Sequence, residues 1–319
     1  MDRRKFLQLG VGLLSTSLVA EVEVTRVTPV IDTHIHLFDP TRKGGVPWPK
    51  EDDSVIYKPA LPGQYEKASR PLGVVGAIVV EASPLESDND WVLEQANNHP
   101  MIVGLVGDLV PGSSSYGKQL DRLRTNPLFL GIRYGNLWDR DLSVDMRKPG
   151  FLSDIQKLAA SGLELDSANP DPSLIRAILD LSQKVPELRF IIDHLPASSI
   201  PDERGVREEY WSNLEAISQN SHVFVKFSEV PVQQGNTVPK DISFYKDKLD
   251  RMWDLFGEER ILFGSDWPNS EHFGSYSEIM GLMRSYMSTK SPLAVEKFFW
   301  RNSIAAYRWH PREASQKLA

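Results

Sequence analysis

Short apolar runs rich in Val, Ile and Phe alternate with segments of helical periodicity along almost the whole chain. The apolar runs lie at residues 29–36, 74–82, 101–110, 128–134, 162–165, 188–194, 222–227 and 260–266. Helical periodicity lies between them, at residues 90–97, 115–123, 151–160, 172–182, 210–218, 244–256 and 276–286. Such alternation is typical of a parallel sheet, because each helix carries the chain back to the end where the next strand begins. Eight units favour the α/β class and a single (β/α)8 TIM-type barrel over a doubly wound sheet with a second domain.

The length of the chain allows one domain or two. At about 150 residues per domain, 319 residues suggest two, but α/β barrels of about 250 residues fold as one. No Gly/Ser-rich linker or shift in composition divides the chain, so we expect one barrel domain over residues 27–311. The longest stretch without a recognisable element is 37–70, which contains five prolines. Long loops often act as lids, and we expect this one to cover the opening of a site.

The first 20 residues have the composition of a targeting segment. Arg3, Arg4 and Lys5 precede 14 uncharged residues, 7–20, a layout typical of a signal peptide. The string DRRKFLQ resembles the twin-arginine export motif. We therefore expect residues 1–20 to be a signal peptide read by the twin-arginine export machinery of a bacterium, and the protein to be periplasmic or secreted. Leu18 and Ala20 fit the small-residue cleavage rule only at the second position, so the segment is either removed or kept as an anchor. Its 14 uncharged residues are fewer than the roughly 20 that span a bilayer, and the mature chain should have no integral membrane span.

The composition limits the kinds of site that the chain can build. Its 36 Lys and Arg against 43 Asp and Glu give a net charge of −7, and no basic run stands out. A nucleic-acid partner is therefore not expected, and a small-molecule substrate is. The chain has no Cys, so disulfides, thiolate metal sites and cysteine nucleophiles are excluded. Any metal must be held by His, Asp or Glu.

Three of the seven histidines are expected at one rim of the barrel. In (β/α)8 barrels the active site lies at the carboxyl ends of the strands. His34 and His36 close the first apolar run and, two residues apart, project to the same side. His194 closes the sixth run and Asp266 the eighth. Two imidazoles beside a carboxylate are typical of a divalent metal site or of a proton-transfer set. The other histidines precede strands or lie in loops and the tail: His99, His222, His272 and His310.

Three further charged residues end predicted strands and complete the candidate site. Arg133 ends the fourth and Lys226 the seventh, where they would orient an anionic or polyhydroxyl substrate. Glu81 ends the second strand, where it would contact the substrate or form a salt bridge with Arg133 or Lys226. The aromatic residues that could line a pocket are Trp48, Tyr57, Trp138 and Trp267.

Several motifs together resemble the amidohydrolase-related family of metal-dependent hydrolases. They are IDTHIHLFDP with PWP downstream, GIRYG, IIDHLP, VFVKFSEV and ERILFGSDWP, in the order and approximate spacing of that family. The resemblance spans nearly the whole chain after the targeting segment. Within the family it is closest to the sugar-lactone and dicarboxylate-lactone hydrolase group.

The resemblance implies a distorted (β/α)8 barrel with a metal site. His34, His36, His194 and Asp266 match metal-ligand positions of the family, and Arg133 matches a substrate-contact position. We therefore expect one divalent metal, zinc. Catalysis without a metal is the alternative, since some lactonases of the group are understood to work without one.

Two positions depart from the family pattern. Many relatives contribute a metal-binding His from strand five, where this chain offers only Glu164 and Asp166. Relatives commonly have His after the Arg of the GIR motif, where this chain has Tyr134. The first departure leaves the metal shell one ligand short. The second changes a substrate contact and weakens any inference of the substrate from the family.

The expected reaction is the opening of a sugar or dicarboxylate lactone by an activated water. Asp266 would take the proton of the water as it attacks the carbonyl. His34 and His36 would hold the ion that polarises this carbonyl, or donate hydrogen bonds to the oxyanion. His194 would complete the metal shell or protonate the leaving alkoxide.

Two other functions stay open from the sequence. A metal-dependent decarboxylase or hydratase could use the same barrel, although the missing strand-five His counts against it. A non-catalytic carbohydrate-binding barrel would keep the aromatic residues but would not need Asp266, so the intact pair of histidines with that Asp counts against it. Hydrolysis of an amide or a phosphoester, instead of a lactone, is a further alternative.

Overall fold

Eight parallel strands form the centre of the molecule, as the alternating pattern predicts. The computed structural model describes residues 28–318, so the predicted targeting segment 1–20 lies outside the described residues. Each strand pairs with the next along the chain, in the order β1 to β8. The strands are β1 (Val30–Ile35), β2 (Val74–Val80), β3 (Ile102–Gly107), β4 (Phe129–Arg133), β5 (Glu164–Ser167), β6 (Arg189–Ile192), β7 (Val223–Phe227) and β8 (Ile261–Phe263). The predicted α/β barrel is confirmed.

The barrel closes between its first and last strands just beyond the end of β8. The backbone N–H of Asp266 donates to the carbonyl of His34 at 2.8 Å, and that of His36 donates to the carbonyl of Trp267 at 2.7 Å. The side chain of Asp32 accepts from the backbone N–H of Ser265 at 2.8 Å. These bonds hold the H-x-H segment directly against the segment that carries Asp266.

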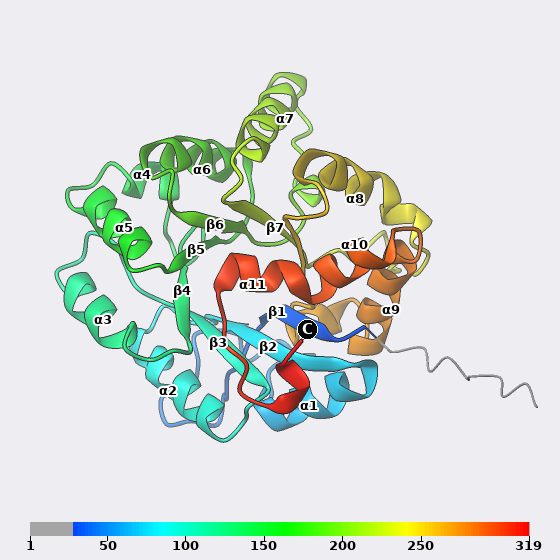
Figure 1. Ribbon diagram of the computed structural model, residues 1–319, viewed down its shortest axis with the longest axis horizontal. Coiled ribbons are helices and arrows are strands. Elements are labelled where there is room, and N and C mark those ends of the chain that lie inside the picture. Colours follow the sequence, from blue (N-terminus) through cyan, green and yellow to red (C-terminus); the bar gives the residue numbers. More distant parts are fainter. Residues whose placement is uncertain (1–27, 319) are drawn as a thin grey trace, which may run out of the picture.

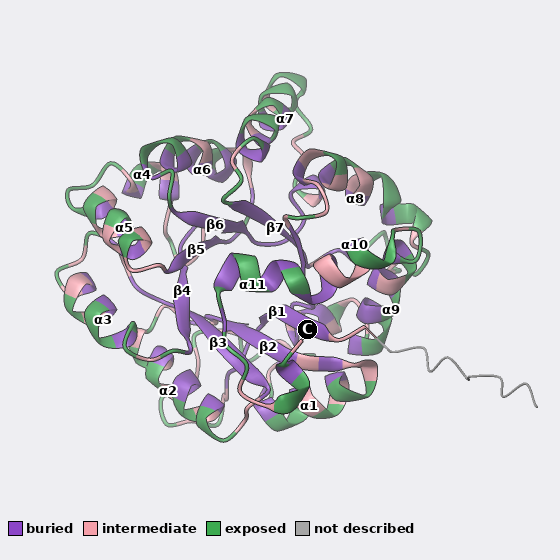
Figure 2. Cartoon of the chain, in the orientation of Figure 1, coloured by how far each residue is buried: buried purple, intermediate pink, exposed green. Residues whose placement is uncertain are grey.

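The helices form a ring around the barrel (Figure 1). Their outer faces are exposed, whereas the strands are buried, except for the half-buried Val75 of β2 (Figure 2). They are α1 (Pro62–Ser69), α2 (Glu86–Asn97), α3 (Tyr116–Leu123), α4 (Leu142–Asp145), α5 (Phe151–Ala160), α6 (Pro172–Lys184), α7 (Arg204–Ser218), α8 (Ser243–Phe256), α9 (Tyr276–Met287), α10 (Pro292–Glu296) and α11 (Asn302–Tyr307). No helix within residues 28–318 is long and apolar enough to cross a membrane.

Local sequence explains where several helices begin. Asp171 caps α6 by accepting from the backbone N–H of Leu174, and Pro172 occupies the first turn, where its missing N–H costs nothing. Ser275 and Glu278 form a reciprocal capping box at the start of α9. These caps fix the length of the loops that lead from β5 and β8, and both loops contribute to the site described below.

Helix α11 covers the end of the barrel where the strands begin, and it crosses that opening in Figure 1. Arg189, the first residue of β6, donates through Nε to the carbonyl of Ala306 at 2.6 Å. The hydroxyl of Tyr307 reaches into the barrel and donates to the carboxylate of Asp166 at 3.0 Å. With this end covered, a ligand has access from the carboxyl ends of the strands.

The segment 37–70 differs partly from expectation. The sequence predicts no regular element there, but its last third forms α1, and Phe38 pairs with Ala60 in an isolated bridge. The expectation fails because Gly63 and a weak apolar periodicity obscure the helix, whereas Tyr65 anchors it by donating to Asp32 at 2.9 Å. The earlier part of the loop reaches the site through Trp48.

Candidate active site

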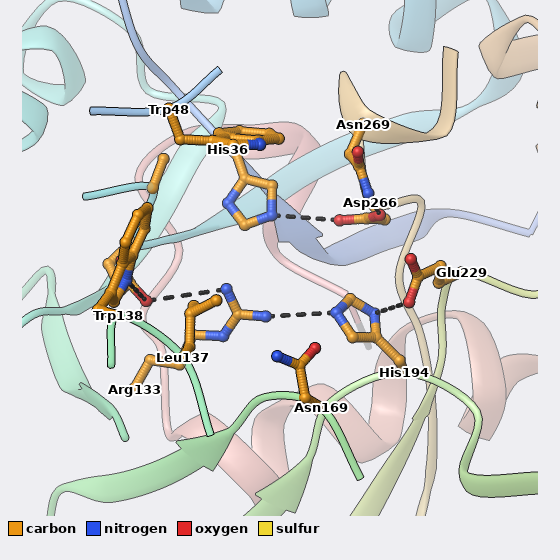
Figure 3. A pocket seen from close by; sticks show the side chains of 12 residues that line it. His36, Trp48, Arg133, Leu137, Trp138, Asn169, His194, Glu229, Asp266 and Asn269 are labelled. Atoms are coloured by element: carbon orange, nitrogen blue, oxygen red, sulfur yellow. Dashed lines mark hydrogen bonds and ion pairs between the residues drawn. The ribbon is translucent and has the colours of Figure 1, made fainter. Parts of the chain in front are cut away.

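The carboxyl ends of the strands surround a cavity of about 200 Å³ (Figure 3). Its size suits a small molecule, and both charged and aromatic side chains line it. The lining residues are His36, Trp48, Glu81, Ala82, Arg133, Leu137, Trp138, Asn169, His194, Glu229, Asp266 and Asn269. The sequence-predicted residues His36, His194, Asp266, Arg133 and Glu81 thus share one cavity.

His34, His36 and Asp266 bring three possible metal-ligand atoms within 4.8 Å of one another. Oδ1 of Asp266 lies 3.1 Å from Nε2 of His36 and 3.6 Å from Nε2 of His34. The alternation of side chains along β1 places both imidazoles on the same side of the strand. Three protein ligands with a position left open are typical of a catalytic metal site.

The hydrogen bonds of the two imidazoles fit a cation between them and Asp266. Nδ1 of His36 lies 3.0 Å from the carbonyl of Val80, which can only accept, so Nδ1 carries the proton. Nε2 of the same ring faces Oδ1 of Asp266, where either a proton on Nε2 or a bound cation would bridge the two atoms. Nε2 of His34 is buried without a hydrogen-bond partner. Burial, reinforced by the charge of Lys226, lowers the pKa of His34 well below its usual value, which keeps the ring neutral as a metal ligand must be.

Asp266 is held in place from two sides. One carboxylate oxygen faces His36, and the other accepts from Nδ2 of Asn269 at 2.7 Å. Burial alone would raise the pKa of Asp266, but the hydrogen bond from His36 and the nearby imidazoles outweigh it and lower this pKa below its ordinary value. Asp266 is therefore ionised at neutral pH.

His194 lies between Arg133 and Glu229 (Figure 3). Its Nε2 is 3.3 Å from Nη2 of Arg133, which can only donate, so this proton-free nitrogen accepts and Nδ1 carries the proton. Nδ1 lies 3.1 Å from the hydroxyl of Ser228 and 3.7 Å from the carboxylate of Glu229. The sequence groups His194 with the metal ligands, and the structure places its ring 4.9 Å from that of His34 but outside the three-residue set.

Arg133 and Glu81 form the opposite side of the cavity. Nε of Arg133 lies 2.8 Å from Asp193, and Nη1 lies 3.8 Å from Glu81. Glu81 also accepts from Nε1 of Trp138 at 3.1 Å, which fixes that indole as a wall. Burial raises the pKa of Glu81, and the charge of Arg133 opposes this effect. The predicted alternative of a Glu81–Arg133 pair is therefore what the geometry shows, while both side chains still face the cavity.

Lys226 lies beneath the cavity and does not line it. The side chain is fully buried, with Nζ 2.5 Å from Asp166 and 2.9 Å from Asp193. It also lies 3.2 Å from Nδ1 of His34. The sequence places Lys226 on the substrate, but this position allows it to orient His34 and Asp193 and not to touch a ligand in the cavity.

Several residues of the site escape sequence reasoning. Asn169, Glu229 and Asn269 line the cavity from the loops after β5, β7 and β8, and Asp193 bridges His34 and Arg133 from below. The backbone conformation also marks the region: among residues 28–318, seven non-glycine residues have positive φ, and five of them line the cavity. These five are Trp138, Asn169, His194, Glu229 and Asp266. Such strained backbone gathers at functional sites, which supports a role for Asn169 and Glu229.

The aromatic residues divide between the cavity and the core. Trp48 packs against His36 with ring centroids 5.5 Å apart, and Trp138 stands on the far wall. Trp267 is buried against Tyr65 instead, and neither it nor Tyr57 lines the cavity.

Comparison with known proteins places this site in a family. A family model described as Amidohydrolase matches residues 31–309 of the chain, which include β2 to β8 and all of β1 except Val30. Among curated proteins, L-fucono-1,5-lactonase from Burkholderia ambifaria is 28% identical over 251 residues, which cover 77% of this chain and 83% of the lactonase.

Solved structures share the fold at lower identity. An amidohydrolase from Burkholderia multivorans superposes with a TM-score of 0.79 at 19% identity when crystallised with HEPES, and of 0.77 at 18% identity with bound zinc. Each alignment covers 88% of this chain and 100% of the other. A Pseudomonas putida protein assigned as a 2-pyrone-4,6-dicarboxylic acid hydrolase superposes with a TM-score of 0.64 at 20% identity, over 88% of this chain and 98% of its own.

Proposed function

The chain belongs to the amidohydrolase family, and we propose that it hydrolyses a lactone by attack of an activated water. The observation that carries this proposal is the carboxylate of Asp266, which lines the cavity with His36 and is held against the imidazoles of His36 and of the buried His34. The names of two similar proteins, a fuconolactonase and a pyrone dicarboxylic acid hydrolase, support a cyclic ester as the substrate.

Asp266 is the base of the proposed reaction. Attack of water on the carbonyl requires that the water lose a proton, and a carboxylate within hydrogen-bond reach can accept it. The contact with Asn269 leaves the oxygen on the histidine side to face the water. Loss of this base should therefore affect the chemical step and not the fold.

His34, His36 and Asp266 would hold the metal that the family implies. A divalent ion bound there supplies positive charge against the oxygen that becomes negative during attack. We propose zinc, because two nitrogens and one carboxylate oxygen are ligands that zinc favours, and a structure of similar fold contains zinc.

His194 and Arg133 act on the other side of the substrate. His194 lines the cavity and can carry a proton to the leaving alkoxide as the ring opens. Arg133, fixed by Asp193 and Glu81, donates to the cavity and orients the substrate. Trp48 and Trp138 supply aromatic walls for a small ring.

We also propose that the protein is exported through the twin-arginine route to the periplasm or beyond. The support is the sequence of residues 1–20, with Arg3 and Arg4 before an uncharged stretch. A folded enzyme loaded with its metal would suit this route.

A panel of lactones tests the proposed reaction. Ring opening of a lactone at neutral pH releases a proton, so the purified protein should acidify a weakly buffered solution of its substrate well above the spontaneous rate. If the protein opens no sugar or dicarboxylate lactone but releases carbon dioxide from a carboxylated compound, decarboxylation replaces the proposal.

A further inference from the structure

The side chains that line the cavity carry more negative than positive charge, and a divalent ion held by His34, His36 and Asp266 would offset the charge of Asp266 but not that of the more distant Glu229. Of the described residues that line it, three are carboxylates, Glu81, Glu229 and Asp266, and Arg133 is the only Lys or Arg. A lactone that carries carboxylate groups would need cationic partners to replace the water it loses on binding. The charge of the lining side chains therefore affects which lactones can bind in the cavity.

Arg133, the one cationic side chain that lines the cavity, is already paired within the protein. Nε of Arg133 lies 2.8 Å from Asp193, and Nη1 lies 3.8 Å from Glu81. The remaining nitrogen, Nη2, lies 3.3 Å from His194. Arg133 therefore already faces two carboxylates before a ligand arrives, Glu81 and the Asp193 that it shares with Lys226, so its charge is partly compensated within the protein.

Glu229 is the carboxylate that an entering ligand meets. Its side chain is 42% exposed, whereas that of Glu81 is 5% and that of Asp266 is 1% exposed. The backbone of Glu229 has a φ of 52°, a left-handed conformation that turns the chain directly after Ser228, and its carboxylate faces His194 across 3.7 Å (Figure 3). Among the ion pairs of residues 28–318, this histidine is its partner, and no Lys or Arg compensates it.

A carboxylate in this position discriminates by charge. It accepts hydrogen bonds from hydroxyl groups, as do the amide oxygens of Asn169 and Asn269 on the neighbouring loops. It repels a second carboxylate within a few ångströms, and the repulsion grows as the ligand excludes water. The same side chain thus favours a hydroxyl-bearing ring and opposes an anionic one.

Building on the proposed lactone hydrolysis, we propose that Glu229 is a specificity-determining residue that selects an uncharged, polyhydroxylated lactone and rejects lactones that carry carboxylates. The negative charge of Glu229 then excludes dicarboxylate lactones from the expected substrates and leaves the sugar lactones.

The experiment compares two sugar lactones of the same ring size, one neutral and one that carries a free carboxylate, at low ionic strength. We measure kcat/KM for the wild type, Glu229→Gln and Glu229→Asp, with Glu94→Gln as the matched control. Glu94 is an exposed residue of α2 away from the cavity, and its replacement changes the net charge equally.

We expect the wild type and Glu94→Gln to prefer the neutral lactone by the same factor. Glu229→Gln should reduce this preference about tenfold or more, mainly by accelerating the carboxylated lactone, because one like charge at close range is removed. Glu229→Asp should keep the preference. Added salt should weaken the preference of the wild type, since the carboxylate is partly exposed.

Two results overturn the proposal: a preference that Glu229→Gln leaves at the value of the control, or a wild type that favours the carboxylated lactone. If the wild type opens neither lactone, the proposed reaction fails, and calorimetric binding of the same two lactones then decides the role of Glu229. A preference in affinity for the neutral lactone that Glu229→Gln reduces would uphold it, and equal affinities would reject it.

Discussion

The Nζ atom of Lys226 lies 2.9 Å from Oδ1 of Asp193, and neither side chain is exposed. Lys226 also contacts Asp166 at 2.5 Å. Asp193 in turn contacts Nδ1 of His34 at 3.4 Å and Nε of Arg133 at 2.8 Å. A buried ion-pair network therefore connects the metal-ligand side of the cavity to its substrate side.

Lys226→Met tests the role of this network. The change leaves Asp166 and Asp193 without their shared cation in the interior, and removal of one partner from a buried ion pair typically costs about 3–5 kcal/mol. Urea unfolding should show a loss of this size, whereas Lys67→Met on the exposed face of α1 should change stability by less than about 0.5 kcal/mol. A stable Lys226→Met protein with only a raised KM would instead place Lys226 on the substrate.

The buried Glu164 should make the free energy of unfolding decrease as pH rises. It is fully buried at the start of β5, where a Cβ on Gly131 would lie 2.2 Å from its Oε1, so the glycine makes room for the carboxyl. Burial and then the charge of Asp166 raise the pKa of Glu164 well above 4.5. The folded state therefore keeps a proton that the unfolded state releases above this pH, and stability declines with increasing pH until the folded group also ionises.

Glu164→Gln removes this dependence, because glutamine is neutral in both states. The stability of the variant relative to wild type should rise between about pH 5 and 7, by at most about 1.4 kcal/mol per pH unit. Denaturant titrations at several pH values measure the difference. The exposed Glu187→Gln should show a constant difference from wild type, and a constant difference for Glu164→Gln as well would mean that Glu164 is ionised in the fold.

The fold follows from the sequence because its signal is periodic. Seven of the eight apolar runs contain one strand each, since buried parallel strands read as continuous apolar stretches, and the fifth run, 162–165, overlaps β5 but ends two residues before the strand does, because Asp166 and Ser167 are polar. The sequence does not predict helix α1, because its anchoring contact, from Tyr65 to Asp32, joins residues 33 positions apart and leaves no local pattern. Local periodicity predicts helices and strands, but it does not detect contacts between distant residues that stabilise a weakly periodic helix.

The site could be predicted only in part. Strand ends and side-chain alternation identify His34, His36, Arg133 and Asp266, because barrel geometry brings these ends together. The same reasoning does not predict how far a side chain lies below the rim of the barrel. Lys226 lies within β7, one residue before its end, and its side chain points into the barrel below the cavity. Loop residues such as Asn169 and Glu229 follow no periodicity, and their left-handed backbone appears only in the structure.

Metal binding should depend on the paired imidazoles. Wild-type protein, stripped by a chelator and then given zinc, should retain one ion per chain and gain about 2.7 kcal/mol of stability at a free zinc concentration one hundred times the Kd. His36→Ala should lose both the ion and the gain, while His310→Ala in the tail should keep them. Elemental analysis and thermal unfolding give the two readouts. A stripped, metal-free protein that hydrolyses its lactone at the original rate would show that the imidazoles act as hydrogen-bond donors.

Export should depend on the arginine pair. Residues 1–25 fused to a reporter that folds in the cytoplasm should carry it across the membrane, and Arg3→Lys with Arg4→Lys should block this transfer. Replacement of Lys5 by Gln in the same fusion controls for the loss of a basic side chain. Unchanged transfer of the double variant, measured by cell fractionation, would assign the segment to another route.

The central claim is that the carboxylate of Asp266 activates the water that opens a lactone. Asp266→Asn keeps the shape of the side chain and its contact with Asn269, so the melting behaviour should stay cooperative. The decisive measurement is kcat on the best lactone of the panel, followed by proton release, for this variant and the wild type. We predict a loss of at least about 100-fold, the lower range for removal of a general base. A folded Asp266→Asn protein that turns over at close to the wild-type rate would contradict the account.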